Sequence, residues 1–142
     1  MNKLKENRNI LLIIYILFAF FIIITSFGNG IMNYLVMTIS YLFVDVSENI
    51  SALSIIIEYC LMGIVYISFG VVALFLFLNC FNDLKYVIIY SVIVSSAVIV
   101  VSMIIKSFYE LDLIKSIFKI VFSMLGILFA FIIECLKVRI KN

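Results

Sequence analysis

Histidine, proline and tryptophan are absent from this sequence, and only 13% of its 142 residues are charged. The lack of histidine removes the commonest general base and the commonest metal ligand of proteins. The three cysteines, Cys60, Cys80 and Cys135, form no CxxC pair, so we expect small apolar side chains in or near helices and no disulfide or metal site. A net charge of +2 is too small to indicate a nucleic-acid partner.

Apolar residues are abundant, at 67% of the chain against roughly 45–50% in ordinary soluble proteins. A soluble domain of 142 residues has no interior large enough to bury that much apolar surface. Much of the exterior must therefore face hydrocarbon, and the lipid bilayer is the first partner we expect.

Four apolar stretches, at residues 10–27, 51–78, 84–105 and 113–136, have the length of membrane-spanning helices. Strands are not indicated, because polar and apolar residues do not alternate. The basic leader before the first stretch could belong to a secretory signal, but the stretch is long and no clean cleavage site follows, so we interpret it as a retained helix. The sequence predicts one all-α domain, a polytopic transmembrane helical bundle.

A fifth apolar segment, residues 31–44, is only 14 residues long and carries polar residues on one helical face. We expect a short helix in the membrane interface. Another span is the weaker alternative, and the sequence leaves open whether the segment lies flat or re-enters the membrane.

The distribution of lysine and arginine predicts the orientation of the four spans. The two tails and the 79–85 turn share one side, whereas the loop at residues 28–49 has no basic residue and two acids. Seven of the ten basic residues fall on the first side, namely Lys3, Lys5, Arg8, Lys85, Lys137, Arg139 and Lys141. We therefore expect both termini in the cytoplasm.

Glu58 is the acid that interrupts the second span, about two turns from its outer end. Placing a charged carboxylate at that depth costs roughly a few kcal/mol or more, unless it forms an ion pair, takes up a proton or faces water. Lys119 lies at a similar depth in the last span, and Lys115 lies one turn above it. We expect an intramembrane polar site formed by Glu58, Tyr59, Lys115 and Lys119, in which Glu58 meets one or both lysines. The pairing of these charges either only fixes helix packing or belongs to a polar site that opens outward.

Small residues recur at helical spacing and predict packing seams between helices. One stripe in the second span contains Tyr59, Gly63, Tyr66 and Gly70, in which the glycines allow close helix approach and the tyrosine hydroxyls need partners. Further seams are expected at Ser91 and Ser95 in the third span and at Gly126 and Ala130 in the fourth. The sequence offers no nucleophile–histidine pair, zinc motif or phosphate loop, so we expect no cofactor and no metal, and whether any catalysis occurs is left open.

The segment at residues 55–63, IIIEYCLMG, resembles the start of the second span in the VanZ-like family of bacterial membrane proteins. In that family a His precedes Glu-Tyr, and a Gly follows four residues after the Tyr. Glu58, Tyr59 and Gly63 match this pattern, as does Gly126 in the last span, and the order of spans and loops is similar along nearly the whole chain. Ile55 replaces the family's His.

Other polar positions of the family also differ here. Val100 and Met103 stand about where an acid and a Gln are typical, and Tyr109 replaces a loop Arg. Acids that open the last span appear as Lys115 and Lys119. The resemblance implies a protein of the bacterial plasma membrane that is linked to the cell envelope and to resistance against teicoplanin-type glycopeptides. It also implies that this chain has lost most of the family's polar groups.

Three functions are consistent with these features. The first is a non-catalytic scaffold or partner-binding protein that acts on another membrane protein. The second is a membrane-embedded enzyme acting on a lipid-linked envelope precursor, with Glu58 as acid or base and Lys119 holding an anionic head group. The third is a small transporter subunit or a bacteriocin immunity protein, which requires an exposed face of small residues.

Overall fold

The computed structural model describes residues 2–26, 36, 38–39, 50–81, 83–107 and 113–141 of the chain. These residues contain four long helices, α1 (Asn2–Ile24), α3 (Ile50–Leu78), α4 (Leu84–Ser107) and α5 (Leu113–Lys141). No strand occurs in these ranges. The predicted all-α class is therefore confirmed.

Each helix holds a segment long and apolar enough to cross a membrane: Asn7–Ile24, Ser54–Leu78, Leu84–Lys106 and Leu113–Leu136. These segments lie within three residues of the stretches predicted from the sequence. The described chain is accordingly a multi-pass helical membrane protein, and the prediction of four spans agrees with the structure.

The end of the first span differs from the prediction that it would reach residue 27. α1 ends at Ile24, and the chain turns at Thr25 and Ser26. Both hydroxyls donate to the carbonyl oxygen of Ile22, at 3.0 Å from Thr25 Oγ1 and 2.8 Å from Ser26 Oγ. These side chains satisfy a carbonyl in the last helical turn, which hydropathy alone does not reveal.

The predicted interfacial helix at residues 31–44 lies outside the described residues, apart from Val36, Thr38 and Ile39. Those three residues have helical backbone, and the side chain of Val36 is buried. The interfacial helix stays a prediction.

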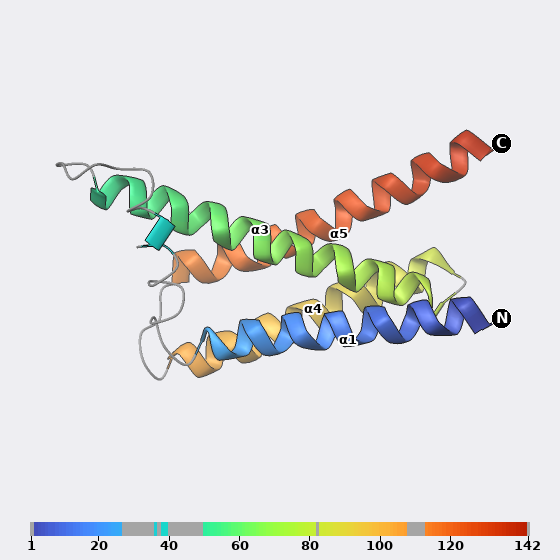
Figure 1. Ribbon diagram of the computed structural model, residues 1–142, viewed down its shortest axis with the longest axis horizontal. Helices are drawn as coiled ribbons and strands as arrows, with labels where there is room; N and C mark the ends of the chain where they lie inside the picture. The colour runs from blue at the N-terminus through green and yellow to red at the C-terminus, as the bar shows by residue number, and fades with distance from the viewer. Residues whose placement is uncertain are drawn as a thin grey trace.

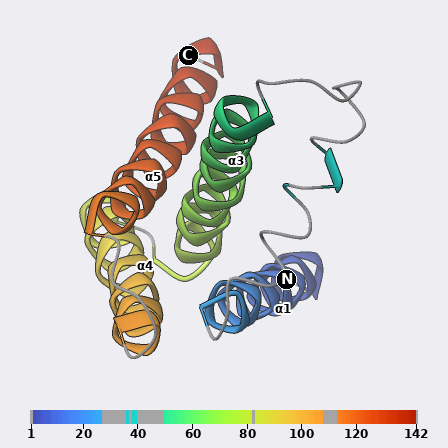
Figure 2. The ribbon, with the colours of Figure 1, turned by 90° about the vertical axis from the view of Figure 1, so that its left-hand side faces the viewer.

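α3 is the central helix, and it packs against each of the other three. Figure 1 shows α3 crossing α5, with α1 and α4 side by side below them, and both chain termini at the same end of the bundle. Figure 2, an end view, places α3 between α5 and α1. We call the end that holds the termini the tail end and the opposite one the pocket end.

The turn between α3 and α4 lies at the tail end. Asn79 Nδ2 donates to the Phe75 carbonyl oxygen at 2.8 Å, closing the last turn of α3. The Asp83 carboxylate accepts the backbone N–H of Lys85 at 3.0 Å, as a helix N-cap residue does. These polar side chains give the short turn a defined geometry, so α3 and α4 run in opposite directions.

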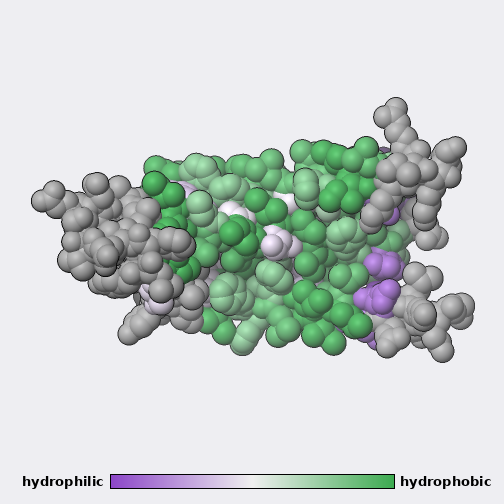
Figure 3. Space-filling view, turned by 45° about the horizontal axis from the view of Figure 1, so that its top comes forward, coloured by the Kyte–Doolittle hydropathy of each residue, from purple (hydrophilic) through white to green (hydrophobic). Residues whose placement is uncertain are grey.

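The interior is built from two apolar clusters. One joins α1, α3 and α4 and is centred on Phe69, whose ring stacks on Tyr15 at 4.9 Å between ring centroids. The other joins α3, α4 and α5 around Leu74, Val87 and Ala130. Outward-facing side chains are also apolar, and Figure 3 shows a largely hydrophobic face between the two ends. Such a surface fits hydrocarbon and not water.

Two glycines bring the backbones of α3 and α5 into direct contact. A methyl group at Gly70 would overlap the Ser123 carbonyl oxygen, and one at Gly126 would overlap the Ile67 carbonyl oxygen. At Gly63, by contrast, an added methyl would lie 3.6 Å from the Phe122 ring, an ordinary contact. We call the contact around Gly70 and Gly126 the glycine crossing.

The other residues expected in packing seams are buried as well. Ser91, Ser95 and Ala130 are each at most 1% exposed. Ser91 Oγ donates to the Val87 carbonyl oxygen of its own helix at 2.7 Å, so it packs as a small residue and forms no bond between helices.

Candidate functional site: a polar pocket at one end of the bundle

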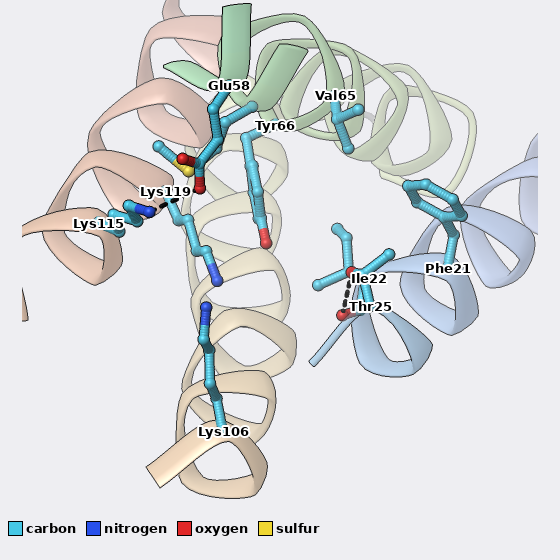
Figure 4. Close-up of a pocket in the computed structure, with 10 residues that line it drawn as sticks. Phe21, Ile22, Thr25, Glu58, Val65, Tyr66, Lys106, Lys115 and Lys119 are labelled. Atoms are coloured by element: carbon cyan, nitrogen blue, oxygen red, sulfur yellow. Dashed lines mark hydrogen bonds and ion pairs between the residues drawn. The ribbon is translucent and has the colours of Figure 1, made fainter. Parts of the chain in front are cut away.

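A polar pocket lies between the helices at the pocket end. All four helices contribute to it, each with the end that lies opposite the chain termini. The lining residues are Phe21, Ile22, Thr25, Glu58, Met62, Val65, Tyr66, Lys106, Lys115 and Lys119 (Figure 4). The cavity has a volume of about 50 Å³, enough for a few waters where polar partners surround them.

Glu58 is joined to Lys115 across the pocket wall. Lys115 Nζ donates to Glu58 Oε1 at 2.7 Å, the short distance of a charge-assisted hydrogen bond. The side chains of Glu58 and Lys115 are 25% and 28% exposed, and both residues line the pocket, so the pair is partly buried beside the cavity. The expectation that Glu58 would meet a lysine of the last span agrees with this geometry.

Lys119 lies deeper, one turn further along α5. Its side chain is 9% exposed, and its ammonium nitrogen lies 5.8 Å from the centroid of the Tyr66 ring. A cation over an aromatic face is attracted by the ring quadrupole, by about 0.5–2 kcal/mol as solvent is removed. The ring of Tyr66 therefore helps to hold a charged lysine inside the bundle.

The hydroxyl of Tyr66 lies near Ser102 of α4. Ser102 is itself held in place, because its Oγ donates to the Ile99 carbonyl oxygen at 2.7 Å. The ring on which Lys119 packs therefore lies at the contact between α3 and α4.

Lys106 completes the pocket, although the sequence did not single it out as a site residue. It is the last residue of the span in α4, and Figure 4 shows its ammonium end pointing toward that of Lys119 from the opposite wall. Because Lys106 lies in the final turn of an apolar span, its position in the sequence already indicated a charged residue at this end of the bundle. The sequence could not show that this turn faces α5.

Tyr59 was expected at the same polar site, but the structure places it elsewhere. It does not line the pocket, and its ring packs edge-on against Phe118, with the centroids 5.3 Å apart. Tyr59 and Glu58 are neighbours in the chain, so they point to different sides of α3. Tyr59 contributes to the contact between α3 and α5.

Three buried hydroxyls away from the pocket have no hydrogen-bond partner within the described part of the chain: Tyr15 Oη, Ser95 Oγ and Ser123 Oγ. Tyr15 and Ser95 approach one another between α1 and α4. The described residues contain no cluster of His, Cys, Asp or Glu that could hold a metal ion. The cysteines Cys60, Cys80 and Cys135 are free and face outward.

The fold and the site thus define a multi-pass helical membrane protein with a lysine-rich pocket at one end of its bundle. Compared with known protein families, curated proteins and solved structures, the chain matches none of them. The arguments for function therefore rest on the residues of this chain.

Proposed function

We propose that this is a VanZ-like protein of the bacterial plasma membrane that acts by binding at the polar pocket, without catalysis. Its proposed role is in the cell envelope, in tolerance of teicoplanin-type glycopeptides. The observation that carries the binding role is that the ends of all four helices converge on one partly open pocket with charged walls. The envelope role rests on the sequence resemblance at residues 55–63.

The state of Glu58 bears on the choice between a scaffold and an enzyme. A scaffold role calls for a paired and dry Glu58, and an enzyme role calls for a watery cavity that reaches it. Glu58 is paired at 2.7 Å and also lines the cavity, so it meets one requirement of each. We favour binding, because the Glu58 carboxylate already serves as the ion-pair partner that holds α3 to α5.

The enzyme alternative is supported by one observation, the access of the cavity to Glu58. In that role Glu58 would transfer a proton on a lipid-linked substrate, and Lys119 would hold an anionic head group. The alternative of a transporter subunit or immunity protein depended on an exposed face of small residues. The stripe residues Gly63, Gly70, Gly126, Ser95 and Ala130 are buried within this chain, which does not favour that alternative.

A double substitution separates binding from catalysis. The full chain is expressed in a glycopeptide-sensitive Gram-positive bacterium, and teicoplanin tolerance and membrane abundance are measured together. Glu58→Gln with Lys115→Gln removes both charges of the pair that joins α3 to α5 and leaves the other lysines of the pocket, Lys106 and Lys119, in place. If the pair serves only to join the helices, the variant should keep its abundance and its effect on tolerance. Normal abundance with lost tolerance would favour the enzyme, and no effect of the unaltered chain on tolerance would refute the envelope role.

The proposed orientation has its own test, which uses the exposed Cys80 of the tail-end turn. With Cys60 and Cys135 replaced by Ser, a membrane-impermeant maleimide should label Cys80 only after the cells are permeabilised. Labelling of intact cells would place the tail end outside and the pocket inside.

A further inference from the structure

An apolar groove lies on α5 beside its crossing with α3. Its volume is about 400 Å³, within the range of roughly 300–1,000 Å³ of ligand pockets in proteins. Ile67 lines the groove from α3, and four side chains line it from α5: Leu125, Leu128, Phe129 and Ile132. These four recur at helical spacing on one face of α5, and each is about half exposed. The groove therefore opens to the surroundings of the bundle and not to its interior.

The depth of the groove matches one leaflet of a bilayer. All its lining residues belong to spanning segments, Ser54–Leu78 of α3 and Leu113–Leu136 of α5. Leu125 is 11 residues from the tail end of its span and Ile132 is four, so by helix rise the groove covers depths of roughly 6–16 Å. One leaflet contributes about 15 Å of hydrocarbon. An acyl chain of a lipid in the tail-end leaflet has the right depth and length to fill the groove.

The lining residues indicate which apolar occupant fits. They have no polar side chain, so a water in the groove would find no side chain to hydrogen-bond. Helices associate in lipid through small residues, and the small residues of the glycine crossing, Gly70 and Gly126, are already used between α3 and α5. The groove offers only Leu, Ile and Phe. A flexible hydrocarbon chain fits this surface better than a helix of a second copy does.

The tail end of the bundle carries an excess of positive charge. Seven basic residues lie there on backbone that the structure describes, against three acids: Glu6, Asp83 and Glu134. Met1, Asn82 and Asn142, which lie outside the described ranges at this end, have uncharged side chains. Four positive charges therefore remain in excess, whatever ion pairs form among these residues. Basic residues next to a membrane span attract anionic lipids.

The basic residues of α5 come directly after the groove. Lys137, Arg139 and Lys141 lie within five residues of the end of the span, or roughly 8 Å, which is the thickness of a head-group layer. Arg139 is seven residues after Ile132, so by helical register it comes on the groove's face of α5. Glu134 is two residues after Ile132, which places it on the opposite face. A head group above the groove therefore lies nearer to basic residues than to this acid.

We propose that the groove and the basic end of α5 together bind one anionic phospholipid of the tail-end leaflet. An acyl chain lies in the groove between Ile67 and the apolar face of α5, and the head-group phosphate lies at Arg139. A guanidinium group matches a phosphate with two parallel N–H donors. The groove shares no residue with the polar pocket, so the proposal does not depend on the function proposed above.

The absence of tryptophan from the chain allows a direct test. Phe129→Trp places a single fluorescent reporter in the groove. Ile93→Trp is its control, because Ile93 of α4 has nearly the same exposure, 57% against 59%, and a similar depth from the tail end. The full chain is reconstituted in phosphatidylcholine bilayers, and phosphatidylglycerol or phosphatidylcholine with brominated acyl chains is added as quencher.

We expect brominated phosphatidylglycerol to quench the Phe129→Trp variant at a mole fraction about fivefold lower than brominated phosphatidylcholine. The two lipids should quench the Ile93→Trp variant equally. The same response of both variants would show ordinary lipid contact at the groove and overturn the proposal. Quenching of Ile93→Trp without quenching of Phe129→Trp would show that another helix covers the groove and would also overturn it. If Phe129→Trp fails to fold, Leu128→Trp places the reporter in the same groove.

Charge variants assign the head group to α5. In the Phe129→Trp background, Arg139→Gln should lower the preference for phosphatidylglycerol about fivefold, as expected for the loss of one basic residue near an anionic surface. Lys5→Gln is the matched control, since it removes one positive charge at the same end from α1, which makes no contact with α5 among the described residues. A preference that survives Arg139→Gln, or one that Lys5→Gln lowers as much, would refute the assignment.

Discussion

The same two helices, α3 and α5, are joined in two contrasting ways. At the glycine crossing, Gly70 and Gly126 allow backbone to touch backbone, and no charge is involved. About 18 Å away along α3, by helix rise, Glu58 and Lys115 join the helices through a 2.7 Å ion pair beside a cavity. At the glycine crossing no space remains between the two helices, whereas a cavity lies beside the ion pair.

The difference indicates a division of tasks between the two regions. In lipid, close packing of small residues is a main source of helix association, because apolar side chains gain little by leaving hydrocarbon for a protein interior. The glycine crossing can therefore hold the bundle together, while the helices at the pocket end remain far enough apart to admit a ligand. We expect substitutions at the crossing to affect stability and substitutions in the pocket to affect binding.

The largest effect is expected for Gly126→Val. Its side chain would overlap the Ile67 carbonyl oxygen, and a backbone atom cannot move aside as a side chain can. The cost should reach about 3 kcal/mol, the upper part of the range for overpacked cores. The measurement is unfolding in mixed detergent micelles, with Gly63→Ala as the tolerated control, since its added methyl meets only the Phe122 ring. Equal stability of the two variants would contradict the glycine crossing.

Glu58→Gln should have the next largest effect. It leaves the Lys115 ammonium without its carboxylate in a site about one quarter exposed, at a cost of about 1–2 kcal/mol. Adding Lys115→Gln should recover much of that loss, because both charges are then gone. A double-mutant cycle with no coupling between the two sites would show that the ion pair contributes nothing to stability.

A pair of Tyr→Phe changes compares the apolar interior with the pocket. Tyr66→Phe removes a hydroxyl of the polar pocket that lies near Ser102 and can donate to it, so stability should fall by about 1 kcal/mol. Tyr15→Phe removes a buried hydroxyl that has no partner among the described residues, so stability should stay equal or rise. The measurement is the unfolding temperature of both variants and of the unaltered chain in the same detergent. A larger loss for Tyr15→Phe would point to a bound water at that hydroxyl.

The smallest effect is expected for Lys106→Gln. Removing one of two ammonium groups that face each other in Figure 4 should raise stability by about 0.5 kcal/mol, the size of an exposed like-charge interaction. Thermal unfolding in neutral detergent is the measurement, with Lys85→Gln at the tail end of the same helix as the control. A fall in stability of Lys106→Gln alone would show that a group of the protein balances the Lys106 charge.

Much of the site could be anticipated because depth in a helix follows from counting residues. Glu58 and Lys115 each lie near the start of a long apolar stretch on the same side, so their meeting was predictable. The roles of Tyr59 and Lys106 were not. Each depends on how far a helix is rotated about its own axis, and a uniformly apolar helix carries little information about that rotation.

The sequence by itself determined that this chain is a helical membrane protein with four spans, because hydrophobicity over some 20 residues is a local and additive property. The tertiary structure alone decided that Lys115 contacts Glu58 while Lys119 faces Lys106 across a cavity. That choice follows from the crossing of α3 and α5 at Gly70 and Gly126, a contact between residues more than fifty positions apart. The rotation set there fixes which side chains enter the pocket.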